Sequence, residues 1–226
     1  MTQLNNLKLS KRLQAIYDMV PQSNVIADIG SDHALLPISL VLNGKVTRAY
    51  ASEVNEGPFE ATVKNIEKHG VSNYVKAVLS DGISELEKDV NTVSICGMGG
   101  SLIVDILDKN KNMLANVSTL VLGPNNNEEN VRIWLMSNGF EIAFERIVEE
   151  DGRFYEIIKA NKGISNYNKE ELFFGPILLK EKSESFLKKW SNQREYLRKI
   201  MLNINDKDCS NYKLLETIVN LINKII

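Results

Sequence analysis

The chain has 226 residues, of which 43% are hydrophobic and 25% charged, so it can form one large domain, or one domain with an appendage, around a sizeable core. No apolar run reaches the roughly 18 residues that a membrane helix needs, and the polar amino-terminal segment lacks the apolar core of a signal peptide, so no membrane partner is expected. The net charge is −2, with 11 Lys and Arg against 8 Asp and Glu from residue 168 onward, which excludes a strongly basic nucleic-acid binder but permits a local basic surface.

Strand and helix signals alternate through most of the chain. Apolar residues at helical spacing predict a first helix over 7–20, ended by Pro21. The short apolar runs that follow predict strands over 24–29, 46–54, 75–79, 92–96 and 119–122, and the segments between and after them predict helices over 33–42, 58–69, 102–115 and 128–138. Such a βα repeat implies a parallel sheet covered by helices on both faces.

The last two predicted strands depart from this repeat. Residues 140–150 and 154–160 flank Asp151-Gly152, a dipeptide favoured in tight hairpin turns, and therefore predict an antiparallel hairpin. Dinucleotide-binding dehydrogenase domains more often keep all their strands parallel, whereas the S-adenosylmethionine methyltransferase fold ends in an antiparallel pair. We therefore predict an α/β fold with a Rossmann-like class I methyltransferase sheet.

The carboxy-terminal segment has a wholly helical pattern. Apolar residues follow an a/d frame from Leu179 to Ile204, with Ser183 and Gln193 as polar positions in the seam. A polar stretch over 205–211 separates this frame from a second apolar periodicity over 214–225. We therefore predict a coiled-coil-like helical hairpin as a C-terminal extension, which divides the chain into domains 1–165 and 166–226.

The first strand leads into the turn that contains Asp28, Gly30 and Asp32. A dinucleotide-binding turn carries three glycines to admit a pyrophosphate, whereas this turn has one glycine and two acids that repel phosphate. An amino-acid head group and a sulfonium suit these acids better, so we predict a zwitterionic or cationic ligand. The alternative is an ordinary α/β turn in which Asp32 caps the next helix.

Acidic side chains also end the next two strands. Glu53 lies at the tip of the second strand, where a carboxylate can hold ribose hydroxyls. Asp81 follows the third strand, where it could accept a hydrogen bond from an adenine amino group. A solvated Glu53 and a plain Asp-Gly turn are the alternatives. Because three successive strands end in acids, we favour a ligand site.

Two further turns follow the fourth and fifth strands. Gly97-Met-Gly-Gly100 predicts a backbone-lined gap opposite the first turn. The chain lacks the Asn/Asp-Pro-Pro-aromatic motif with which many amino-methylating enzymes hold a planar target nitrogen. The nearest substitute is Asn125 or Asn126, whose amide could hydrogen-bond a base edge. Close helix–strand packing and a helix cap are the alternative roles of these two turns.

The histidines and cysteines have different expected roles. His33 lies in the ligand turn and is a candidate to bond the cofactor or to accept a proton. His69 precedes Gly70 at a helix end and is predicted to be structural. Cys96 and Cys209 are far apart and in no metal-binding spacing, so we expect no metal, no disulfide and a cytoplasmic setting. Cys96 is expected to be a small buried residue.

Six segments resemble those of one enzyme family and lie in the same order along nearly the whole chain. They are LSKRL (9–13), ADIGSDHALLP (27–37), EVNEGP (53–58), GMGG (97–100), EEDGRFYEI (149–157) and FGPILLKEK (174–182). In these segments the chain closely resembles the bacterial tRNA (adenine-22-N1)-methyltransferases. Two positions depart from the pattern, because Leu35 replaces a frequent Tyr and Gly123 replaces a typical Gln.

The resemblance implies that the chain transfers a methyl group from S-adenosylmethionine to N1 of adenine 22, in the D-arm region of tRNA. Carried over by position, it implies a cofactor site formed by Asp28, Gly30, Ser31, Asp32, His33, Glu53, Asp81, Gly82, Gly97 and Met98. Adenine N1 has a lone pair that can attack the methyl group directly, so the enzyme must mainly align the reactants and exclude water.

The methylated adenine is cationic and must lose a proton, so we predict Asp32 or His33 as the acceptor, with Asn125 at the base edge. The target nucleotide must also be exposed or flipped out of its stack. The candidates to grip the tRNA backbone are Lys11, Arg12, Lys180, Lys182, Lys188, Lys189, Arg194, Arg198 and Lys199.

Three alternatives stay open at this point. The helical tail could serve only to dimerise or to pack on the domain, and we expect a monomer or a weak homodimer. The acidic body also allows a small-molecule methyltransferase. The two departures at Leu35 and Gly123 allow a tRNA-binding adaptor that no longer transfers methyl groups.

Overall fold

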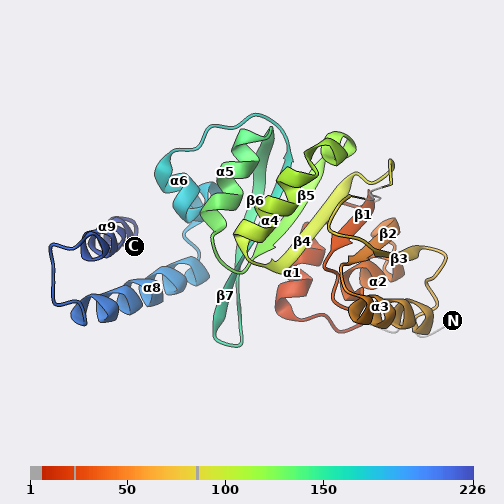
Figure 1. Ribbon diagram of the computed structural model, residues 1–226, viewed down its shortest axis with the longest axis horizontal. Helices are drawn as coiled ribbons and strands as arrows, with labels where there is room; N and C mark the ends of the chain where they lie inside the picture. The colour runs from red at the N-terminus through yellow and green to blue at the C-terminus, as the bar shows by residue number, and fades with distance from the viewer. Residues whose placement is uncertain (1–6, 23, 85–86) are drawn as a thin grey trace. The chain divides into compact units, whose positions relative to one another are not determined.

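The computed structural model describes residues 7–22, 24–84 and 87–226. A seven-stranded sheet with the order β3-β2-β1-β4-β5-β7-β6 forms its centre (Figure 1). Strands β1 to β5 are parallel, whereas β7 and β6 are antiparallel to their neighbours, as predicted. The strands are β1 (Asn24–Ile29), β2 (Val46–Glu53), β3 (Val75–Leu79), β4 (Thr92–Met98), β5 (Thr119–Pro124), β6 (Phe140–Glu150) and β7 (Arg153–Lys162).

Helices cover the sheet on both faces. The chain moves outward from β1 to β3, returns to β4 and then continues in the opposite direction. Because parallel crossovers are right-handed, this reversal places α2 and α3 on one face and α4 on the other. In Figure 1, α4 and α5 lie side by side in front of the sheet. The helices of this part are α1 (Lys11–Met19), α2 (Leu35–Leu42), α3 (Glu56–Lys68), α4 (Gly100–Lys109), α5 (Glu128–Ser137) and α6 (Lys169–Phe174).

Burial follows the position of each strand in the sheet. Every residue of β5 is buried, as expected for a central strand with helices on both sides. In β6, at the edge, buried Phe140 and Ile142 are separated by exposed Glu141. The β6–β7 turn consists of Asp151 (φ 50°) and Gly152 (φ 74°), and two positive φ angles are what a two-residue hairpin turn requires.

Two predicted helices and one predicted cap differ from what the structure shows. Helix α2 begins at Leu35 instead of residue 33, because residues 32–34 adopt left-handed backbone angles. The helix predicted over 102–115 is interrupted at Asn110 and consists of α4 and a 3₁₀ helix, Lys111–Asn116. Asp32 does not cap α2, whose N-cap is Ala34 without a side-chain hydrogen bond, so that alternative is wrong.

The chain divides into two compact units, the first ending at Pro176 and the second comprising Ile177–Ile226. The boundary proposed after residue 165 would have assigned α6 to the tail, whereas the structure groups α6 with the sheet. In the second unit α8 (Glu184–Leu202) packs on α9 (Ser210–Ile225), and α7 (Pro176–Glu181) precedes them. Ser183 is the N-cap of α8 and not a seam residue, since its side chain accepts a hydrogen bond from the Phe186 amide. Within the described residues no helix is both long and apolar enough to cross a bilayer.

A buried ionic cluster attaches α6 to the sheet. Arg132 of α5 donates to Glu145 (Nε–Oε1 2.8 Å) and to Glu156, and none of the three side chains is more than 1% exposed. Arg132 also donates to the backbone carbonyls of Leu172 and Phe173 at the end of α6. Burial lowers the pKa of the guanidinium, but the two glutamates outweigh this effect and raise that pKa above its ordinary value. The cluster therefore stays ionised and ties α5, the β6–β7 pair and α6 together.

Candidate active site

The turn after β1 has an unusual backbone. Gly30 has φ 68°, and Asp32, His33 and Ala34 follow with φ 44°, 63° and 55°. Left-handed angles cost a non-glycine residue about 1–2 kcal/mol each, so this run must be stabilised by contacts around it. Strain of this kind often marks a functional segment. A Cβ atom on Gly30 would overlap the terminal methyl of Met98, so the turn after β1 and the turn after β4 meet at this glycine.

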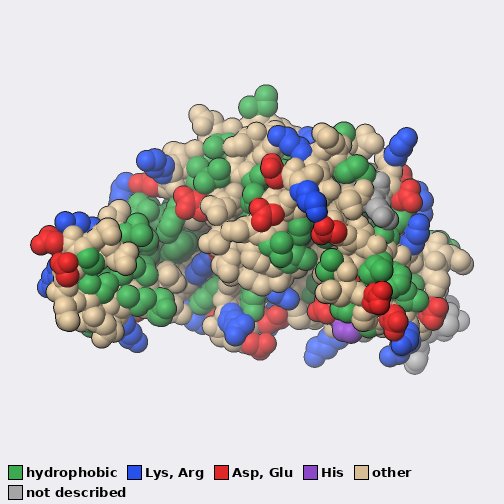
Figure 2. All heavy atoms as spheres, viewed as in Figure 1, with side chains coloured by type: hydrophobic (Ala, Val, Ile, Leu, Met, Phe, Trp, Pro, Cys, Tyr) green, Lys and Arg blue, Asp and Glu red, His purple; other side chains and the backbone are tan. Residues whose placement is uncertain are grey.

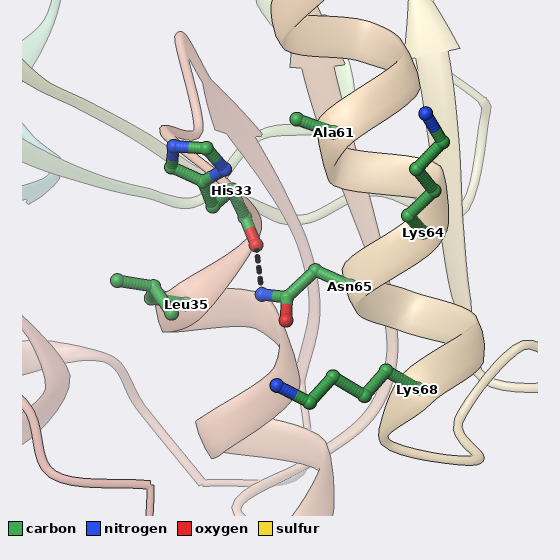
Figure 3. A pocket seen from close by; sticks show the side chains of 6 residues that line it. All are labelled: His33, Leu35, Ala61, Lys64, Asn65 and Lys68. Carbon is green, nitrogen blue, oxygen red and sulfur yellow. Dashed lines mark hydrogen bonds between the residues drawn. The ribbon is translucent and has the colours of Figure 1, made fainter.

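Two side chains from neighbouring elements hold the strained turn. The Glu53 carboxylate accepts a hydrogen bond from the Asp32 amide (2.8 Å), and the Asn65 side-chain amide donates to the His33 carbonyl (2.6 Å). Figure 3 shows Asn65 reaching from α3 to that carbonyl. The turn is therefore bonded to the end of β2 on one side and to α3 on the other.

Asp28 is buried beneath this turn. Its two carboxylate oxygens accept hydrogen bonds from the hydroxyls of Ser31 and Ser94, both at 2.6 Å. Burial raises its pKa to about 6, although the two serine hydrogen bonds act in the opposite direction. Ser94, in the middle of β4, was not predicted as a site residue. A serine within an otherwise apolar strand was the available signal, since a buried hydroxyl needs a partner.

The raised pKa of Asp28 predicts a pH-dependent stability. The folded state binds this proton more tightly than the unfolded state, whose pKa is near 3.8, so stability from Asp28 is lost as the pH rises through about 6. Without cofactor, the free energy of unfolding of Asp28→Asn should rise relative to that of the wild type by about 1 kcal/mol when the pH is raised from 5 to 8. Urea unfolding at both values measures this gain. The exposed Asp105→Asn is the control, and an equal gain in both variants would contradict the assignment.

The other two predicted acids differ in their surroundings. Glu53 is 8% exposed and lies at the end of β2, and burial raises its pKa. Asp81, after β3, is exposed and forms a salt bridge with Lys109 of α4 (2.5 Å). Gly82 is tied to β2, because the Ser52 hydroxyl donates to its carbonyl (3.2 Å). Glu53 is thus held in the site, whereas Asp81 is at its solvent edge.

The turns after β4 and β5 pack directly against one another. The Asn125 side chain donates to the Gly97 carbonyl (2.7 Å), and the Asn125 amide donates to the Met98 carbonyl (2.8 Å). A Cβ atom on Gly100 would lie 2.6 Å from the Asn126 carbonyl oxygen, so this glycine is required for close packing. Gly97, by contrast, is exposed. The packing alternative therefore describes Gly100, whereas the backbone-lined gap stays a prediction.

His33 and Cys96 take different positions around the site. The His33 ring lines a hollow of about 420 Å³ against α3, together with Leu35, Lys64 and Asn65 (Figure 3). Its Nε2 lies 3.7 Å from the Asp32 carboxylate, and both side chains are largely exposed. Burial raises the pKa of the Cys96 thiol, which makes it a poor nucleophile.

The basic candidates belong to both units. Arg12 of α1 reaches the end of β4, where its Nη1 atom is 3.9 Å from the position of a Cβ on Gly97, and Lys11 is exposed. In the second unit Arg194 and Arg198 both contact Glu195 and Asn223. Lys180 and Lys188 are exposed and Lys189 is partly buried. Figure 2 shows acidic and basic side chains interspersed on the face in view.

This end of the sheet has the features that S-adenosylmethionine requires. It lies at the reversal of strand order between β1 and β4, where ligands bind in open α/β sheets. Asp28, Asp32 and Glu53 supply negative potential for a sulfonium and an ammonium group. Arg12 Nε is buried without a hydrogen-bond partner among the described residues, so one cation is left for an anionic group. The residues present therefore fit a zwitterionic nucleoside.

Comparison with known proteins identifies relatives over nearly the whole chain. The sequence model of the family "TrmK: tRNA (adenine(22)-N(1))-methyltransferase" matches residues 26–224. The tRNA (adenine(22)-N(1))-methyltransferase of Bacillus subtilis is 39% identical over 204 residues, which are 87% of this chain and 86% of that protein.

Solved structures agree with this relationship. The Bacillus subtilis TrmK crystal structure has a TM-score of 0.89 and 35% identity, covering 97% of this chain and 99% of the other. A Streptococcus pneumoniae relative, solved in complex with S-adenosyl-L-methionine, has a TM-score of 0.90 and 39% identity, covering 96% and 99%. The chain therefore belongs to the TrmK family of tRNA (adenine(22)-N(1))-methyltransferases.

Proposed function

We propose that this protein transfers a methyl group from S-adenosylmethionine to N1 of adenine 22 in tRNA. The observation that carries the proposal is the family match over residues 26–224, which includes every residue of the site except Arg12. When bound, S-adenosylmethionine supplies an electrophilic methyl group on a positively charged sulfur. The remaining tasks, which are orientation, exclusion of water and removal of a proton, fall to the chain's own side chains.

The geometry at the strand ends supports the cofactor contacts that we propose. Glu53 is held by the Asp32 amide at one oxygen, which leaves carboxylate lone pairs for ribose hydroxyls. Gly30 and Gly97 allow close approach of the backbone to the ligand. Ser31, Met98 and Gly82 line the same edge, with Asp81 toward the adenine. Asp28 contributes through its charge and through Ser31, since its own oxygens are already bonded.

For the base, we propose Asn125 and Asp32. The Asn125 amide donates to the Gly97 carbonyl, which orients the side chain and leaves its carbonyl oxygen for the adenine amino group. Asp32 is the better proton acceptor, because its backbone is bonded to Glu53 inside the site while its carboxylate is exposed. The His33 ring faces the α3 hollow, so a direct role for His33 is less favoured.

The test is methyl transfer to unmodified tRNA transcripts, with labelled S-adenosylmethionine and mass spectrometry of nuclease digests. We expect N1-methyladenosine at position 22, and no product with a transcript that carries G at that position. If the protein binds the cofactor but methylates none of the transcripts, the tRNA proposal is contradicted. That result would favour the small-molecule methyltransferase or the non-catalytic adaptor.

The tail is tested in the same assay. Neutralising Arg194 and Arg198 with glutamine should raise the KM for tRNA about 10-fold and make it less dependent on salt. Each phosphate contact releases counterions when tRNA binds, so binding with fewer contacts releases fewer of them. The cofactor Kd should stay unchanged. Lys207→Gln, in the turn before α9, is the control. An unchanged KM would leave the tail with a packing or dimerising role, and light scattering checks the expected monomer or weak homodimer. A tRNA substrate would place the enzyme in the cytoplasm.

A further inference from the structure

We propose that Arg12 binds the carboxylate of the S-adenosylmethionine methionine moiety, and that Tyr155 positions its guanidinium for this contact. The inference rests on the use of this cofactor in the proposed function, but it does not depend on the identity of the methyl acceptor. It also assigns Arg12 a role different from the grip on tRNA that its basic character alone suggested.

The first turn of α1 is held in place by β6. Glu150, the last residue of that strand, accepts hydrogen bonds from the backbone amides of Lys11 (2.6 Å) and Arg12 (3.4 Å). Ser10 caps the helix by accepting from the Leu13 amide. The backbone of Arg12 is thus tied to the hairpin end of the sheet, more than a hundred residues away along the chain.

The guanidinium lies over the end of β4. Its Cζ atom is 4.9 Å from the centre of the Tyr155 ring, and its Nη1 and Nη2 atoms are 3.9 and 4.0 Å from the position of a Cβ on Gly97. Gly97 has φ 81° and is exposed, so the backbone here leaves room beside the guanidinium. Arg12 therefore lies beside the carboxyl end of β4, the strand next to β1.

This guanidinium lacks an anion. Contact with an aromatic face occupies the flat side of the group and leaves its in-plane N–H donors available. Arg12 Nε is buried without a hydrogen-bond partner, and Arg12 forms no salt bridge within the described residues. The nearby Asp28 and Glu53 carboxylates are bonded to other groups. An anionic ligand group would satisfy these donors with a pair of charge-assisted hydrogen bonds.

The charges around the crevice favour a carboxylate over a tRNA phosphate. Asp28, Asp32 and Glu53 would repel a phosphodiester, which brings only negative charge. The methionine moiety brings its own ammonium and sulfonium groups, which those acids attract. Glu53 on β2 and Arg12 over β4 also lie on opposite sides of β1. One ligand that spans the Gly30 turn can therefore meet Glu53 through its ribose and Arg12 through its carboxylate.

Calorimetry on the full chain, without tRNA, tests the assignment. The probes are S-adenosylmethionine and its decarboxylated analogue, which keeps the sulfonium and the amine. The wild type should bind the analogue about 10- to 100-fold more weakly. Arg12→Ala should weaken the binding of S-adenosylmethionine by a similar factor and leave the Kd of the analogue unchanged. Arg12→Lys should recover part of the loss, and Tyr155→Leu should cost less than Arg12→Ala.

The outcomes separate the two roles. The exposed Lys8→Ala is the matched control and should bind both probes as the wild type does. Equal affinity of the wild type for both probes would overturn the proposal without any variant. An unchanged cofactor Kd with a raised KM for tRNA in Arg12→Ala would also overturn it and assign Arg12 to the tRNA. A failure to methylate tRNA would not affect these binding results, so the two proposals fail separately.

Discussion

Replacing Arg132 by methionine should lower the free energy of unfolding by about 3–5 kcal/mol, the usual cost of removing one partner from a buried ion pair. Without the guanidinium, Glu145 and Glu156 would be two buried carboxylates that repel each other. The carbonyls of Leu172 and Phe173 would also lose a donor, so α6 should detach more easily. Urea unfolding followed by circular dichroism measures the change.

Two further variants separate charge from packing. Arg153→Met removes an exposed arginine at the start of β7 and should change stability by no more than about 0.5 kcal/mol. The triple variant Arg132→Met, Glu145→Leu, Glu156→Leu should recover much of the loss, because an apolar cluster leaves no unpaired charge. A single Arg132→Met variant as stable as Arg153→Met would show that the cluster contributes nothing net.

Replacing Glu53 by alanine should weaken S-adenosylmethionine binding by about 100-fold, from the loss of charge-assisted hydrogen bonds and of the bond that holds the Asp32 amide. The left-handed turn would lose its attachment to β2 and would have to be ordered again by the ligand. Glu53→Gln keeps an oxygen for the Asp32 amide, so it should lose only about 10-fold. Calorimetric Kd values for the cofactor and for its demethylated product check both numbers.

The control for Glu53 is its neighbour on α3. Glu56→Gln changes an exposed carboxylate at the start of that helix and should leave the cofactor Kd within about twofold, although a small loss of helix stability is expected from the macrodipole. Thermal unfolding of all three variants shows whether the fold is intact. A folded Glu53→Ala protein with wild-type affinity would remove Glu53 from the cofactor site.

The sequence alone determined the architecture and the chemistry at the strand ends. Strands β1 and β3 have the predicted bounds. Strand β1 lies inside the sheet, where a strand covered on both faces is an apolar run between polar turns. The Asp151-Gly152 hairpin was predictable because few dipeptides accept two positive φ angles. The single glycine and the acids at residues 28 and 32 argued against a pyrophosphate by space and charge alone.

Other features were decided by tertiary contacts between residues far apart in the chain. Ser94 bonds Asp28 across 66 positions, and Asp32 adopts its strained angles because Glu53 holds its amide. Left-handed angles at three consecutive non-glycine residues are costly, so no local pattern predicts that turn.

The position of the domain boundary and the direction of Arg12 depend on the same kind of contact. Arg132 holds α6 against the sheet, which moves the boundary from residue 165 to Pro176. Tyr155 and Gly97 direct Arg12 to the crevice, where composition suggested only a basic helix face. Hydrophobic periodicity and turn residues predict structure from residues that are close along the chain. Buried charges and strained turns depend on partners that are brought together only by folding.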